Sequence, residues 1–102
     1  MDINKLLEGI RCTCGKKHTC DIEYVSIEKN AIAHLRTICG KYRSILIVAD
    51  ENTFAAAGEH TVSALNGKHV EKVIFSGKEI LVPNEAAISQ VQEYLGSSDL
   101  IV

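Results

Sequence analysis

SILIVAD, residues 44–50, is the clearest secondary-structure signal in the chain. Its apolar run from Ile45 to Ala49 is not interrupted by polar residues, which predicts a strand buried on both faces. Such a strand is typical of the centre of a parallel sheet that helices cover on both sides. Asp50 ends the run and is therefore expected at the carboxyl edge of the sheet.

Helix and strand patterns alternate on both sides of this strand. Apolar residues at helical spacing predict helices, and short apolar runs between turn residues predict strands. The helices are expected within residues 3–10, 31–39, 54–65 and 84–95, and the other strands at 24–27, 72–75 and 99–102, with 80–82 extended. Residues 11–21 are expected to be irregular. The alternation predicts an α/β fold with a doubly wound, mainly parallel sheet and right-handed crossovers.

Residues that cap helices support these boundaries. Asn52 and Thr53 are candidate N-caps for the helix that contains Phe54, and Asn84 is a candidate N-cap for the last helix. Gly96 follows the last apolar residue of that helix, where a C-cap is expected.

The length of 102 residues leaves room for one domain at most. We expect residues 1–22 to form an N-terminal helix and a cysteine-rich segment, and residues 23–102 to form the first part of a nucleotide-binding α/β domain. The chain ends on the last residue of an apolar strand, so we expect the sequence of the parent protein to continue beyond Val102.

Composition excludes several classes of function. The net charge of −2 argues against nucleic-acid binding, which needs a surplus of Lys and Arg. No apolar run approaches the roughly 18 residues that a membrane-spanning helix needs. Acidic residues near the N-terminus do not fit a signal peptide, so a cytoplasmic location is expected. In that compartment the cysteines are expected to be thiols or metal ligands rather than disulfides.

Asp50 has two interpretations from the sequence alone. Ligands of open α/β sheets bind just outside the carboxyl ends of the strands, where an acid can accept both hydroxyls of an adenosine ribose and repel a 2′-phosphate. The alternative is a helix N-cap or a solvated loop acid. No glycine pair has the spacing of a phosphate-binding turn within these residues.

A cysteine and histidine cluster, Cys-x-Cys-x3-His-x-Cys, is the second candidate site. Three thiolates and one imidazole could complete a tetrahedral zinc site, and the residues are Cys12, Cys14, His18 and Cys20. The Cys-x-Cys spacing is tighter than the usual two-residue knuckle, so the alternatives are adventitious zinc and a thiol-rich loop without metal.

Five segments carry a resemblance to a known family: CTCGKKH (12–18), VSIE (25–28), ILIVADENT (45–53), LVPNE (81–85) and DLIV (99–102). They resemble segments of the glycerol-1-phosphate dehydrogenases, in the iron-containing alcohol dehydrogenase and dehydroquinate synthase-like superfamily. The resemblance covers nearly the whole chain, but only about the first quarter of a family member. It implies a partial Rossmann-like dinucleotide-binding domain.

The resemblance implies a parent enzyme that is an NAD(P)-dependent dehydrogenase of a small polyol phosphate. The expected reaction interconverts sn-glycerol-1-phosphate and dihydroxyacetone phosphate, with a divalent metal (Zn, Ni or Fe) polarising the reacting oxygen. Asp50 matches the acid that holds the adenosine ribose and favours NAD over NADP, and Asn84 matches a residue near the cofactor. The glycine-rich turn, the ligands of the catalytic metal and the substrate contacts would all lie beyond Val102. The cysteine cluster does not match that metal site.

These residues alone are therefore expected to be catalytically inactive and to bind NAD weakly or not at all. We also expect self-association into a homo-oligomer, because apolar surface of the sheet would be left uncovered. The rival interpretation is a free-standing α/β interaction or zinc-binding module that uses the Cys/His cluster. A Gly-x-Gly-Ser-like turn encoded after residue 102 would contradict the rival.

Overall fold

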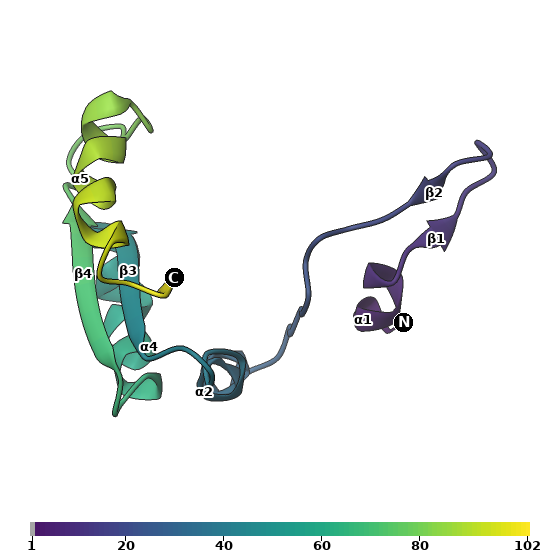
Figure 1. Cartoon of the computed structure of the whole chain (residues 1–102), viewed down its shortest axis with the longest axis horizontal. Coiled ribbons are helices and arrows are strands. Elements are labelled where there is room, and N and C mark those ends of the chain that lie inside the picture. Colours follow the sequence, from purple (N-terminus) through teal and green to yellow (C-terminus); the bar gives the residue numbers. More distant parts are fainter. Residues whose placement is uncertain (1) are drawn as a thin grey trace. The chain divides into compact units, whose positions relative to one another are not determined.

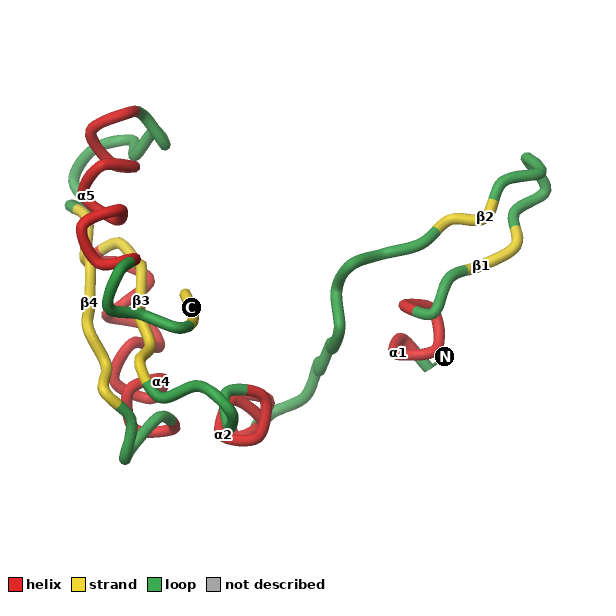
Figure 2. The backbone as a smooth tube through the Cα atoms, in the orientation of Figure 1, coloured by secondary structure: helices red, strands yellow, loops and turns green. Residues whose placement is uncertain are grey.

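The computed structural model describes residues 2–102, and the chain divides into two compact units, residues 1–31 and 32–102. These are called unit 1 (residues 1–31) and unit 2 (residues 32–102). Figure 1 gives the labels of the helices and strands, and Figure 2 distinguishes helices, strands and loops by colour. None of the helices formed by residues 2–102 is long and apolar enough to cross a membrane.

The described residues of unit 1 form one short helix and one short hairpin. Helix α1 spans Ile3–Leu7, and the Asp2 side chain caps it by accepting hydrogen bonds from the Asn4 and Lys5 amides. Strands β1 (Ile10–Arg11) and β2 (Lys17–His18) pair in the antiparallel direction. The expectation that residues 11–21 are irregular is corrected in part. Arg11, Lys17 and His18 lie in these two strands, because the residues on either side of the Cys-x-Cys turn pair with each other.

The predicted strand at 24–27 is wrong, since these residues form no helix or strand. The β-branched and aromatic residues there favour extended backbone, but a strand also needs a neighbouring strand to pair with. Val25 is held instead by the Asn4 side chain, which donates to the Val25 carbonyl (3.3 Å) and accepts from its amide (3.2 Å). The predicted opening helix also ends earlier than expected, at Leu7, and Ile10 begins strand β1.

Unit 2 is built around a three-stranded parallel sheet. Its strands are β3 (Ser44–Asp50), β4 (His69–Phe75) and β5 (Leu100–Ile101), in the order β4-β3-β5. Val48 pairs with Val73 on one side, and Leu46 pairs with Ile101 on the other. The fold class predicted from residues 44–50 is therefore confirmed, with β3 as the central strand.

Both faces of β3 are buried at Ile45, Leu46 and Ile47, as the uninterrupted apolar run predicts, whereas Val48 and Ala49 are half-buried and line a groove. On one face Ile45 and Ile47 pack with Cys39 and Leu65 to form the hydrophobic core. Leu46, which points to the opposite face, is also fully buried. Alternate side chains of this strand thus pack into apolar layers on opposite faces of the sheet. A strand with one solvated face packs into only one such layer.

Helical segments connect the strands of unit 2. The 3-10 turn η1 (Ala31–His34) and α2 (Leu35–Ile38) precede β3, matching the helix expected within 31–39 in position but with a tighter first turn. Between β3 and β4 the chain forms α3 (Glu51–Thr53), the π-helical segment η2 (Phe54–Gly58) and α4 (Glu59–Ala64). Helix α5 (Glu85–Leu95) precedes β5 and has Asn84 and Gly96 as its caps, as predicted.

Candidate functional site

Asp50 lies at the carboxyl end of the central strand, the position that the sequence predicts. Its carboxylate is the N-cap of α3, because Oδ1 accepts a hydrogen bond from the Thr53 amide at 2.8 Å. The Thr53 hydroxyl also donates to Oδ1, at 3.2 Å, and the Asp50 amide donates to this hydroxyl at 3.1 Å. This reciprocal capping confirms the N-cap interpretation of Asp50 and corrects the expectation that Asn52 or Thr53 is the cap, because only Asp50 retains extended backbone.

The same hydrogen bonds stabilise the ionised form of Asp50. The Thr53 backbone amide, the strongest influence, lowers the pKa of the carboxyl below its ordinary value. Ionised at neutral pH like any exposed aspartate, the carboxylate keeps its charge to a lower pH than usual, and the cap persists until the pH falls through this lowered pKa. Each carboxylate oxygen has two lone pairs, so capping through Oδ1 leaves capacity to accept hydrogen bonds from a ligand.

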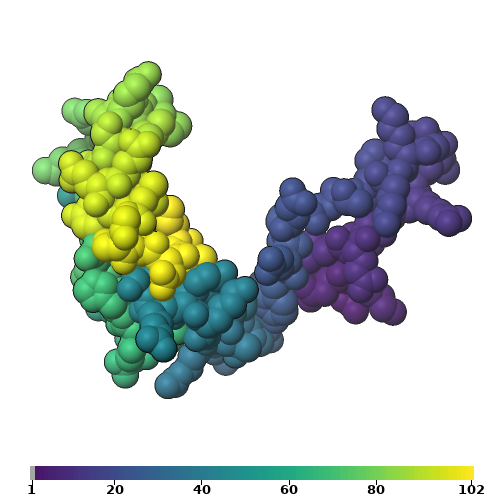
Figure 3. Space-filling view, viewed as in Figure 1, coloured from purple at the N-terminus to yellow at the C-terminus, as the bar shows by residue number. Residues whose placement is uncertain are grey.

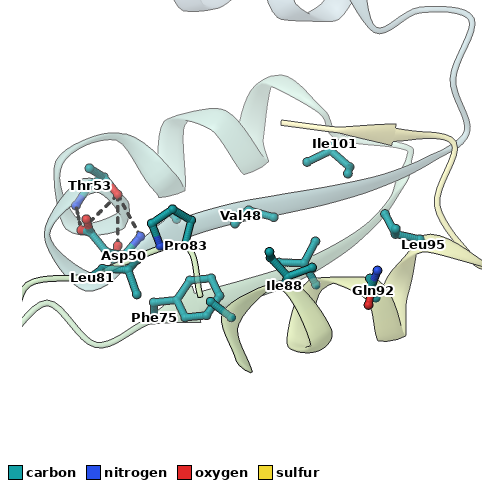
Figure 4. Close-up of a pocket in the computed structure, with 13 residues that line it drawn as sticks. Val48, Asp50, Thr53, Phe75, Leu81, Pro83, Ile88, Gln92, Leu95 and Ile101 are labelled. Atoms are coloured by element: carbon teal, nitrogen blue, oxygen red, sulfur yellow. Dashed lines mark hydrogen bonds between the residues drawn. The ribbon is translucent and has the colours of Figure 1, made fainter. Parts of the chain in front are cut away.

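A groove of about 600 Å³ begins beside Asp50 and runs along the α5 side of the sheet. Its walls are mostly apolar and come from β3, β4, β5, the loop before α5 and α5 itself. In Figure 4, Asp50 and Thr53 lie at one end with Leu81 and Pro83, and Leu95 lies at the other. The groove therefore combines an anionic end with an apolar floor.

Part of the groove wall is open to solvent. Ile88, Leu95 and Ile101 are 48%, 45% and 50% exposed, although all three line the groove. Figure 3 shows helix α5 and the C-terminal segment, coloured yellow-green to yellow, on the visible surface of unit 2. A flat apolar group could therefore reach the groove without any movement of the backbone.

Asn84 does not line the groove that contains Asp50. It caps α5, with its Oδ1 accepting from the Ala87 amide at 3.0 Å, and it lines a separate hollow of about 350 Å³. The two cavities share the wall residues Phe75, Leu81 and Ala87. The two cofactor-binding candidates thus lie on either side of a common wall, rather than facing one ligand position.

Replacing Asn84 with alanine should destabilise unit 2 by about 1 kcal/mol, because the first turn of α5 loses its side-chain cap. Asn84→Asp and Asn84→Ser should retain most of the stability, since both residues are good N-caps. Urea unfolding followed by circular dichroism measures all three variants. Equal stability of Asn84→Ala and the unsubstituted chain would show that the cap contributes nothing to the free energy of unfolding. Ligand contact would then remain as the role of this side chain.

Two hydrogen bonds that sequence reasoning did not predict hold the carboxyl edge together. The Asn52 side chain donates to the Gly77 carbonyl at 3.2 Å, and the Gly77 amide donates to Glu51 Oε2 at 3.1 Å. These bonds tie the start of α3 to the loop that follows β4. Their partners are 25 and 26 residues apart, so no local pattern reveals them.

The Cys/His cluster lies on the hairpin of unit 1. One ligand atom from each of Cys12, Cys14 and His18 lies within 4.8 Å of the other two, and Cys14 Sγ is 3.2 Å from His18 Nε2. The Cys14 amide donates to Cys12 Sγ at 3.5 Å, and this bond is the main cause of a lowered pKa of the Cys12 thiol. Cys20 does not belong to this group of atoms among the described residues. The structure therefore brings together three of the four candidate metal ligands.

Comparison of the chain with protein-family models, with curated proteins and with solved structures found no match.

Proposed function

We propose that unit 2 is the adenosine-holding part of an NAD-binding domain, from a metal-dependent dehydrogenase of a small polyol phosphate. The observation that carries the proposal is the position of Asp50, at the carboxyl end of the central parallel strand and at one end of an apolar groove. Ligands of open α/β sheets bind outside this edge. The reaction and the substrate, the sn-glycerol-1-phosphate/dihydroxyacetone phosphate pair, come from the family resemblance.

The chemistry of the groove fits the adenosine half of the cofactor. An ionised carboxylate can accept hydrogen bonds from the two ribose hydroxyls, and the apolar floor suits a flat adenine ring. The same charge repels the 2′-phosphate of NADP, which favours NAD. The parent enzyme's catalytic metal would supply electrophilic polarisation of the substrate oxygen, and the resemblance assigns no ligand of that metal to these residues.

The proposal predicts weak but selective binding. We expect a dissociation constant of about 1 mM or weaker for NAD, because the backbone donors of a pyrophosphate-binding turn are not among these residues. NADP should bind at least about fivefold more weakly, because charge repulsion between Asp50 and the 2′-phosphate opposes it. Chemical-shift changes of the isotopically labelled chain measure both affinities, and we expect the largest changes in residues 50–53 and in the groove.

The variant Asp50→Asn tests the role of the charge. Asparagine is as good an N-cap as aspartate, so the fold should be retained while the charge is removed. The preference for NAD over NADP should then fall to less than about twofold. Asp21→Asn, an exposed acid in unit 1, changes the net charge equally and should leave the preference unchanged. Equal binding of NAD and NADP by the unsubstituted chain would contradict the proposal. So would the absence of chemical-shift changes near Asp50 when NAD is added.

A further inference from the structure

Unit 1 contains a cluster of three strong metal-ligating side chains on a single hairpin. The thiols of Cys12 and Cys14 and the imidazole of His18 have their ligand atoms within 4.8 Å of one another. A tetrahedral zinc ion with bonds of about 2.0–2.3 Å has neighbouring ligand atoms at separations below this limit, so small side-chain movements would complete the geometry.

The backbone of the hairpin explains why these three side chains converge. The Gly15 amide donates to the Cys12 carbonyl at 3.1 Å, which closes a tight turn between the two cysteines and β2. Gly15 has φ +82°, a left-handed conformation that other residues adopt at a cost in free energy. A Cβ atom at this position would meet no other atom within 4 Å, so the glycine is needed for its backbone conformation and not for space. The pairing of His18 with Ile10 then returns the imidazole to the cysteines. The turn also directs the Cys14 amide at Cys12 Sγ, where an N–H group stabilises a thiolate.

The packing of unit 1 supplies an independent argument for a metal ion. None of residues 2–31 is buried, so the described part of this unit has no hydrophobic core. Units of this size usually need a disulfide or a metal ion to fold stably. All three cysteines of unit 1 are free thiols in the structure, so no disulfide supplies this stabilisation.

We propose that Cys12, Cys14 and His18 bind one zinc ion, which fixes the hairpin of unit 1. Two thiolates and an imidazole form a ligand set that suits Zn²⁺ better than the hard cations Mg²⁺ and Ca²⁺. On binding, each thiol loses its proton to solvent, and the neutral imidazole donates a nitrogen lone pair. A water molecule completes the tetrahedron, since Cys20 lies outside the group of converging atoms. This inference does not rest on the proposed function of unit 2.

The test is a titration of the whole chain, kept reduced with a phosphine, with Zn²⁺ and with Co²⁺ as a spectroscopic probe. We expect one metal ion per chain, release of about two protons per ion near neutral pH, and cobalt spectra of tetrahedral thiolate ligation. Amide chemical shifts should change in residues 10–20 and stay constant in the core of unit 2. Mg²⁺ should have no effect at the same concentration.

Single-residue variants test the ligand assignment. Cys14→Ser and His18→Asn should each weaken zinc binding by about 100-fold or more, because each removes one of three protein ligands. Cys20→Ser is the matched control and should leave stoichiometry and affinity unchanged. As a control, the amide chemical shifts of unit 2 should be unchanged in each variant, which would show that unit 2 is still folded. The proposal is overturned if Cys20→Ser weakens zinc binding as much as Cys14→Ser. It is also overturned if the unsubstituted chain binds no zinc at micromolar concentrations of the metal.

Discussion

Replacing Ile45 with alanine should destabilise unit 2 by about 3 kcal/mol, because three buried carbon atoms are lost and a cavity replaces them. Ile45 is fully buried and packs with Cys39, Ile47 and Leu65 at the centre of the core. Its neighbours belong to a sheet strand and to helix ends that are fixed by hydrogen bonds, so they can fill the cavity only in part. Urea unfolding, followed by circular dichroism, measures the loss as a lower midpoint at constant slope.

The matched control is Ile80→Ala, since Ile80 is 92% exposed and the same atoms are removed. This control should change the free energy of unfolding by less than about 0.5 kcal/mol. If Ile45→Ala proves too unstable to fold, Ile45→Val should still fold and lose about 1 kcal/mol. Equal effects of the alanine substitutions at 45 and 80 would mean that β3 is not the centre of the sheet.

The same strand explains why the architecture could be predicted from the sequence. Burial of both faces leaves a pattern of consecutive apolar residues in 45–49 that few other environments produce. Helix α5 was predicted with similar accuracy, because its two caps, Asn84 and Gly96, are local signals. In both cases the information lies within a few consecutive residues.

The errors arise where structure depends on residues far apart in the chain. Residues 24–27 have the composition of a strand, yet they form none, and Val25 is held by Asn4 instead. Composition cannot show whether a partner strand is present. The start of α3 was misplaced because Asp50, Asn52 and Thr53 are all good N-caps, and only the end of the strand selects among them.

The candidate sites show the same division. The edge position of Asp50 follows from the direction of one strand, so the sequence was sufficient to predict it. The groove beside it depends on how α5 lies against the sheet, which periodicity does not define. For the cysteine cluster, the spacing indicated the ligands, but only the hairpin separates Cys12, Cys14 and His18 from Cys20.

Replacing Gly58 with valine should also destabilise unit 2, by about 2–3 kcal/mol, because there is no room for a side chain there. Gly58 is the last residue of the π-helical segment η2 and is buried. A Cβ atom at this position would overlap the Phe54 ring and lie 2.5 Å from its Cγ. The ring would have to move, and it would then lose its position 5.4 Å from Lys72 Nζ. The loss is measured by the same urea unfolding.

Two further variants separate this steric effect from the helix propensity of valine. Ala57→Val places the same side chain at the exposed neighbouring position and should cost only about 0.6 kcal/mol. In the background Phe54→Ala the ring is absent, so Gly58→Val should cost at least about 1 kcal/mol less than in the parent chain. The overlap argument fails if Gly58→Val is no more damaging than Ala57→Val. It fails equally if removal of the Phe54 ring gives no relief, because the clash would then not be with that ring.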